Sequence, residues 1–130
     1  MSQIVFISVV NVIEIHRRLI NEFGGDPGLR DRGLLESAVA MPGATFSENY
    51  LHPELSDMAA AYLFHLCSNH PFINGNKRVA VAASEVFLLA NNCTLCASNE
   101  ELEETTVGTA KGYVSKKEVT HFFTGRVKQP

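Results

Sequence analysis

The sequence predicts an all-α protein, and three of its features support this class. Apolar residues recur at three- and four-residue steps over long segments, capping residues stand where these segments begin, and the only strand candidates are short. The chain has 130 residues, of which 45% are hydrophobic and 19% are charged, and this balance is typical of a globular domain with one apolar core. We therefore expect one domain over residues 1–130, folded as a helical bundle.

Four helices are expected in the first 90 residues, each with an apolar stripe at helical spacing. Their predicted bounds are residues 9–23, 32–41, 55–69 and 76–90. Ser8 and Asp31 are suitable N-caps for the first two, and Gly24 ends the first. Pro71 ends the third, because the residue before a proline disfavours helical geometry. The fourth is almost free of charge along its middle, with Val86 in its stripe, so we expect it to be buried at the centre of the fold.

Two capping boxes mark the starts of two further helices. Ser98 is followed three residues later by Glu101, and Ser115 is followed in the same way by Glu118. The only strand candidates are two short stretches, residues 4–7 and 94–97. Both are too short to change the predicted fold class.

Composition also limits the compartment and the partners. No apolar run reaches the roughly 18–20 residues that a membrane-spanning helix needs. The first residues lack the basic start of a signal peptide, and Glu14 interrupts their apolar stretch. A net charge of -3 gives no reason to expect a nucleic-acid partner, and three cysteines suit a reducing compartment. We expect a cytoplasmic protein that binds neither membranes nor nucleic acid.

One loop gathers the residues that could carry chemistry. It joins the third and fourth predicted helices and reads His70-Pro71-Phe72-Ile73-Asn74-Gly75-Asn76-Lys77-Arg78. The first N–H groups of a helix lack internal partners and carry partial positive charge, so such a helix start suits a phosphate. Gly75 would let the backbone approach the anion, and Lys77 and Arg78 would add charge. Because cations at a helix N-terminus are unfavourable for the helix itself, their presence indicates an anionic ligand.

His70 lies directly before this expected phosphate site. An imidazole titrates near neutral pH and can take a proton from an attacking hydroxyl group. Phosphoryl-type transfer needs mainly positioning, charge neutralisation and such a base. The alternatives for these residues are structural: His70 as a helix C-cap, and Lys77 and Arg78 as solvated charges. His16, on the apolar stripe of the first helix, is interpreted as a core histidine and is not a catalytic candidate.

The nine-residue loop resembles the signature of the Fic/Doc family, H-x-F-x-D/E-G/A-N-G/K-R. Three further stretches are similar to Doc-like members, and the likeness runs from about residue 14 to residue 123: GGDPGLRDRGLLESAVA, AAAYLFHLCSNHPF and ETTVGTAKGYVSKKEV. The resemblance implies the all-α Fic fold, ATP and Mg²⁺ as ligands, and transfer onto a protein hydroxyl. It also implies that His70 is the general base, that Phe72 is the buried anchor of the loop, and that three residues contact the phosphates: Asn76, Lys77 and Arg78.

Two positions resemble the Doc type more than the AMP-transferring Fic proteins. Lys77 stands where those proteins have glycine, and Val81 stands where they have a second arginine. The resemblance therefore implies a toxin that transfers the γ-phosphate of ATP to a threonine of elongation factor Tu and arrests translation. Transfer of AMP or another nucleotide is the alternative enzymatic reading.

Asn74 departs from the family pattern, which has Asp or Glu as a Mg²⁺ ligand at this position. An amide offers Mg²⁺ one neutral oxygen without the charge that the ion prefers. A third reading is therefore a non-catalytic, partner-binding member of the family. The inhibitory motif of many Fic proteins, S/T-x-x-x-E-G/N, is absent from the sequence. By resemblance, we expect a small antitoxin on a separate chain to restrain this protein.

Overall fold

A computed structural model describes residues 3–130, and over these residues it consists of six helices and four short strands. In chain order the elements are α1 (Val9–Phe23), α2 (Arg32–Ala40), β1 (Thr45–Phe46), β2 (Asn49–Tyr50), α3 (Leu55–Asn69), α4 (Asn76–Ala90), β3 (Thr94–Leu95), α5 (Asn99–Ala110), α6 (Lys116–Thr124) and β4 (Val127–Lys128). The all-α prediction is confirmed. The bounds expected for the first, third and fourth helices are those observed, and α2 ends one residue early.

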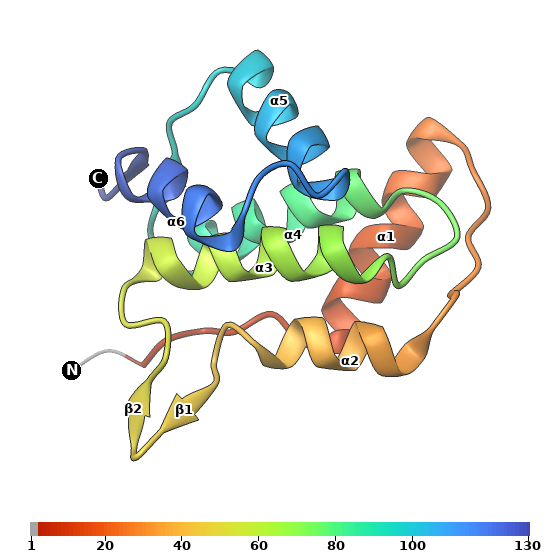
Figure 1. The fold of residues 1–130 in the computed structure, drawn as a ribbon. Coiled ribbons are helices and arrows are strands. Elements are labelled where there is room, and N and C mark those ends of the chain that lie inside the picture. Colours follow the sequence, from red (N-terminus) through yellow and green to blue (C-terminus); the bar gives the residue numbers. More distant parts are fainter. Residues whose placement is uncertain (1–2) are drawn as a thin grey trace.

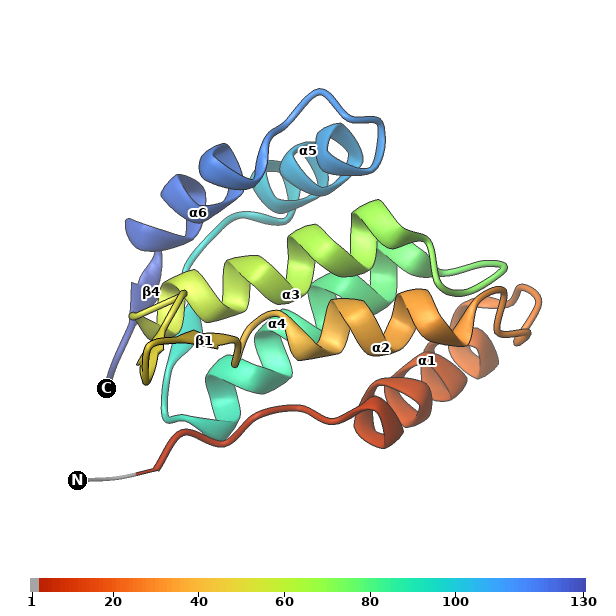
Figure 2. The same ribbon diagram turned by 60° about the horizontal axis from the view of Figure 1, so that its bottom comes forward.

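The helices form three layers, as Figures 1 and 2 show from two sides. The middle layer holds α3 and α4, the two helices joined by the motif loop. The first layer, α1 and α2, covers one side of them, and α5 and α6 cover the other. Eight residues of α3 and six of α4 are buried, so these two helices supply most of the core. The motif loop emerges at one end of this central pair.

Local capping explains where several helices begin. Ser8, Ser98 and Ser115 each accept a hydrogen bond from the backbone N–H three residues later. In return, each of the later side chains accepts a bond from the serine N–H. The two predicted capping boxes, at α5 and α6, are therefore confirmed, and Asp31 caps α2 as expected. Each cap contributes about 1 kcal/mol to its helix.

The strand expected over residues 4–7 is wrong. This segment is extended, but side chains replace a partner strand. Asn91 bonds both the N–H and the carbonyl of Val5, and the Tyr62 hydroxyl does the same for Ile7. The second candidate, over residues 94–97, is confirmed in part, because β3 covers its first two residues and pairs antiparallel with β4.

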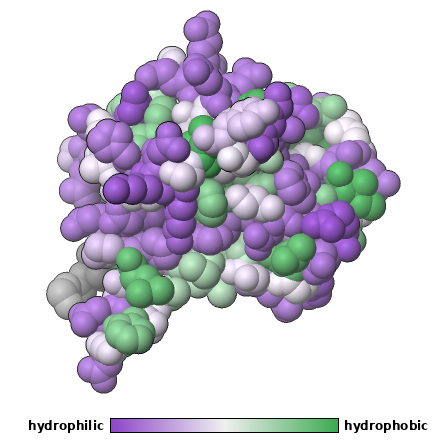
Figure 3. Space-filling model, in the orientation of Figure 1, coloured by the Kyte–Doolittle hydropathy of each residue, from purple (hydrophilic) through white to green (hydrophobic). Residues whose placement is uncertain are grey.

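A hairpin that the sequence analysis did not predict joins α2 to α3. Its strands β1 and β2 pair antiparallel around Ser47 and Glu48, both of which have positive φ. A turn of this kind favours Asn-Gly or Asp-Gly, and the missing dipeptide explains why it was overlooked. The hairpin projects from the body at the end of α3 remote from the motif loop (Figure 1). Hydrophobic residues are visible on the surface of this hairpin (Figure 3), and Phe46 is one of its exposed side chains.

The position of Val86 also differs from the expectation. Helix α4 buries Val79, Ala83 and Phe87, but Val86 is 38% exposed, because it lies beside the stripe that faces α3.

Among residues 3–130, no helix combines the length and the apolar character needed to cross a membrane.

Candidate active site

The motif loop is a tight reversal between two antiparallel helices. His70 ends α3 in the left-handed conformation, with φ at 46°, and Gly75 begins α4 in the same region, with φ at 79°. A residue with a Cβ pays a steric cost there, and glycine does not. Two left-handed residues thus turn the chain from the end of one helix into the start of the next.

Phe72, the residue expected to anchor the loop, lies in the core with 2% of its surface exposed. Its ring stacks on the imidazole of His16, with 3.7 Å between centroids and 9° between planes. The Nε2 of His16 lies 2.7 Å from the carbonyl oxygen of Asn74. Helix α1, through a residue 58 positions away in sequence, therefore holds both the Phe72 ring and the Asn74 carbonyl of the loop. The sequence offered one signal for this contact, the histidine on the apolar stripe of α1.

Asn76 also holds the loop, from its other end. Its Oδ1 accepts a hydrogen bond from the N–H of Phe72, and its Nδ2 donates to the carbonyl of the same residue, both at 2.9 Å. The side-chain amide therefore bonds the loop through both its oxygen and its nitrogen. The backbone N–H of Asn76 belongs to the first turn of α4, where amides lack partners within the helix, and it is available to an anion.

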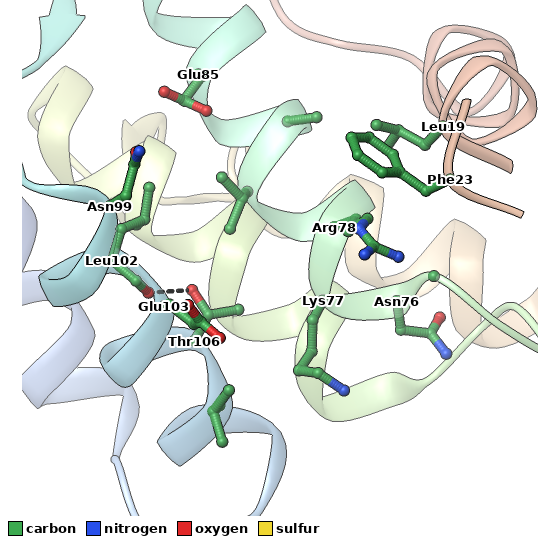
Figure 4. Close-up of a pocket in the computed structure, with 14 residues that line it drawn as sticks. Leu19, Phe23, Asn76, Lys77, Arg78, Glu85, Asn99, Leu102, Glu103 and Thr106 are labelled. Carbon is green, nitrogen blue, oxygen red and sulfur yellow. Dashed lines mark hydrogen bonds between the residues drawn. The ribbon is translucent and has the colours of Figure 1, made fainter. Parts of the chain in front are cut away.

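The first turn of α4 opens onto a cleft of about 600 Å³. Figure 4 shows Asn76, Lys77 and Arg78 on one side of it, with Phe23 of α1 beside Arg78 and residues of α5 opposite. Gly75, the N-cap, has no side chain to bond the free amides of this turn. No ion pair in the described part of the chain involves Lys77 or Arg78. The guanidinium of Arg78 lies 4.4 Å from the ring centroid of Phe23, which fixes its place at the rim.

His70 lies at the opposite end of the loop, and it is exposed and not among the residues that line the cleft. Arg30 fixes the backbone at this point. Its Nε donates to the His70 carbonyl at 2.6 Å, and its Nη2 donates to the Asn69 carbonyl at 2.9 Å. A cation that bonds the last carbonyls of a helix is favourable for the helix dipole. The sequence analysis did not assign this role to Arg30, because its partner is 40 residues away.

A segment between α1 and α2 runs beside the loop. The N–H groups of Arg30 and Asp31 bond the Pro71 carbonyl, and the N–H of Ile73 bonds the Gly28 carbonyl. Asn74 joins the same pairing, since its Oδ1 accepts from the N–H of Asp26 at 2.8 Å.

The candidate metal position does not form a dedicated cation site. The Oδ1 of Asn74 is already an acceptor for Asp26, and its Nδ2 donates to the Ile73 carbonyl. Within residues 3–130 no group of three His, Cys, Asp or Glu side chains converges. Mg²⁺ is usually held by one or two carboxylates, so the neutral side chain of Asn74 does not fit it.

The chain is similar to known proteins across the region that contains this site. A sequence model described as the Fic/DOC family matches residues 6–88, which include α1 to most of α4. "Toxin Doc" of Mycolicibacterium smegmatis is 48% identical over 75 residues, and this match covers 58% of each protein. "Protein kinase doc" of Escherichia phage P1 is 32% identical over 113 residues, or 87% of this chain and 88% of the phage protein. The match thus spans under two thirds of the mycobacterial protein and most of the phage protein.

Proposed function

Because the chain belongs to the Fic/DOC family, we propose that it is a Doc-type toxin that transfers the γ-phosphate of ATP to a protein hydroxyl group. One observation carries the proposal. The start of α4 has no side-chain cap, and within the described residues Lys77 and Arg78 make no ion pair; this helix start opens onto a cleft and follows a loop that begins at His70. The similarity to a phage protein named as a protein kinase supports phosphoryl transfer over other reactions.

The cleft favours the triphosphate at the start of α4. The backbone amides of Asn76 and Lys77, together with the Lys77 and Arg78 side chains, would bind its oxygens. The attacking hydroxyl oxygen forms a bond to the γ-phosphorus, and the bond from that phosphorus to ADP breaks. The proton of the hydroxyl passes to the imidazole of His70, which is exposed and so accessible to a protein substrate.

The substrate that we propose is a threonine of elongation factor Tu, whose modification would arrest translation in the cytoplasm. This assignment rests on the Doc-type positions Lys77 and Val81. Both residues line the cleft, where a glycine and a second arginine would give a different charge distribution.

A non-catalytic role is the second candidate, and the side chain of Asn74 favours it. This amide supplies no charge to a metal ion, and both of its ends are engaged within the protein. The cleft and its cations would then bind a nucleotide or a partner without transferring a group.

A transfer assay separates these functions. Purified elongation factor Tu is incubated with Mg²⁺, the protein and ATP labelled at either the γ or the α position. Label from γ-labelled ATP with the wild-type chain, lost in His70→Ala, is the expected result. Label from the α position would instead establish nucleotide transfer. Label only with Asn74→Asp would assign the non-catalytic role to this chain, and no label with any variant would remove the kinase proposal.

We also propose that a small antitoxin restrains the protein in trans. The support is the absence of an inhibitory S/T-x-x-x-E-G/N motif in the sequence, together with the similarity to a protein named as a toxin. Purification of the tagged chain from its native host is expected to recover a small second protein. Recovery of the chain alone, still able to arrest growth when overproduced, would contradict this part of the proposal.

A further inference from the structure

We propose that His16 is a positioning residue for the phosphate site, which it shapes by fixing the peptide bond between Asn74 and Gly75. The inference deepens the proposed function, and it depends on that function only for the identity of the anion. The claim that His16 fixes this peptide bond can be tested without an assay of catalysis.

The hydrogen bond defines the protonation of the ring. A backbone carbonyl can only accept, so the Nε2 of His16 must carry a hydrogen and donate it to the Asn74 oxygen at 2.7 Å. This requirement is met by the neutral Nε2–H tautomer and by the charged ring. The stack on Phe72 holds the ring plane, and with 2% of its surface exposed the imidazole has no water competing for that bond.

The bond acts on Gly75 through the planarity of the peptide. The Asn74 carbonyl and the Gly75 N–H belong to one trans peptide, so they point in opposite directions. With the carbonyl held against His16, the Gly75 N–H must point away from α1. A flip of this peptide would reverse that N–H and change the φ of 79° from which α4 starts.

The imidazole also lies beside Gly75. A Cβ at this position would lie 3.4 Å from the His16 Nε2 and 3.5 Å from the Ile20 Cδ1. These are ordinary contact distances, so the ring that bonds the Asn74 carbonyl also lies next to Gly75. Because Gly75 and Asn76 line the cleft, the orientation of this peptide affects where the free amides of the helix start lie.

A residue that merely fills the core would act through its ring, and a positioning residue would act through its donor. Two substitutions separate these roles. His16→Phe keeps an aromatic ring to stack on Phe72 but has no N–H. His16→Gln loses the ring and keeps a terminal N–H at a similar distance from the backbone. His121→Phe, at an exposed histidine of α6, is the matched control for the change of residue type.

The test combines ATP binding, measured by calorimetry in Mg²⁺, with the backbone amide signals of Gly75, Asn76 and Lys77 in ¹⁵N spectra. His16→Phe is expected to shift these amides and to weaken ATP binding by about tenfold, the equivalent of one lost internal hydrogen bond. His16→Gln is expected to recover most of the affinity, and His121→Phe to behave as wild type. Unchanged affinity and amide signals in His16→Phe, or a His16→Gln variant no better than His16→Phe, would overturn the proposal.

Two further measurements keep the outcomes distinct. If the wild-type chain binds no ATP, the proposed function fails, and the amide signals of the two variants alone decide the role of His16. If His16→Phe does not fold, the side-chain ¹⁵N spectrum of the wild-type protein decides it. A hydrogen on Nε2 of His16 is the expected state, and a ring protonated only on Nδ1 would refute the positioning bond.

Discussion

Replacement of Asn76 by alanine would show whether this amide serves the loop or the ligand. In the structure both ends of the amide are occupied, because Oδ1 accepts from the Phe72 N–H and Nδ2 donates to the Phe72 carbonyl. Asn76→Ala removes both bonds and leaves the backbone groups of Phe72 without these partners. The loop would then lose the contact that joins its first half to the start of α4.

The size of the effect follows from those two bonds. Each has a length of 2.9 Å in a partly buried place, and an internal hydrogen bond contributes about 0.5–1.5 kcal/mol. The free energy of unfolding should therefore fall by about 1–3 kcal/mol. For a chain of 130 residues, about 1 kcal/mol corresponds to about 3–5 °C in Tm, so the expected decrease is about 3–15 °C.

Thermal and urea unfolding measure this loss, and calorimetry measures ATP binding on the same samples. The matched control is Asn99→Ala, an exposed amide that lines the same cleft from α5 and should change stability by less than about 0.5 kcal/mol. Asn76→Asp should keep the bond from the Phe72 N–H and show an intermediate loss. A variant Asn76→Ala with wild-type Tm but no ATP binding would refute the reasoning, because the amide would then act on the nucleotide directly.

Two other perturbations have expected outcomes. Tyr62→Phe removes the hydroxyl that bonds both backbone groups of Ile7, and it should lower the free energy of unfolding by about 1–3 kcal/mol in urea titrations. Tyr113→Phe, at a tyrosine that is 80% exposed, is the control, and equal losses in the two variants would contradict the assignment. Burial and then the charge of Lys116 lower the pKa of His65 to about 4, so the unfolded chain takes up a proton below pH 6.5 that the folded chain does not. Unfolding free energy should thus fall by about 1–3 kcal/mol between pH 6.5 and 4, and a fall of the same size in His65→Leu would exclude this cause.

The helices could be predicted because their signals are local. A capping serine and its partner three residues later lie within one turn, and an apolar stripe needs only the sequence of its own helix. The strand predicted over residues 4–7 was wrong for the opposite reason, because the partners of this segment are distant in sequence. Its partners are the side chains of Tyr62 and Asn91, which lie 55 and 86 residues away. The four apolar residues from Ile4 to Ile7 indicated a strand, and nothing in them could identify side chains as the hydrogen-bonding partners.

The candidate site divides in the same way. The part of the cleft formed by Gly75 to Arg78 consists of neighbours in sequence and could be found as a motif. The contacts that hold the motif in place from other parts of the chain could not, although His16 gave one signal as a histidine on the apolar stripe of α1. His16 and Arg30 bond backbone carbonyls, and a carbonyl is present at every position, so no pattern of residue types identifies their partners.

These backbone contacts help to explain why an asparagine, and not an aspartate, stands at position 74. Three segments hold the loop: α1 through His16, the stretch before α2 through Asp26 and Arg30, and the start of α4 through Asn76. All of these bonds join groups of the protein itself, so Asn74 is one member of a hydrogen-bond network that shapes the loop. An aspartate at position 74 could still accept from the Asp26 N–H, but it would place an oxygen where the amide now donates to the Ile73 carbonyl. An asparagine therefore suits the hydrogen bonds of this loop better than an aspartate would, and Lys77, Arg78 and the start of α4 are positive groups that face the cleft.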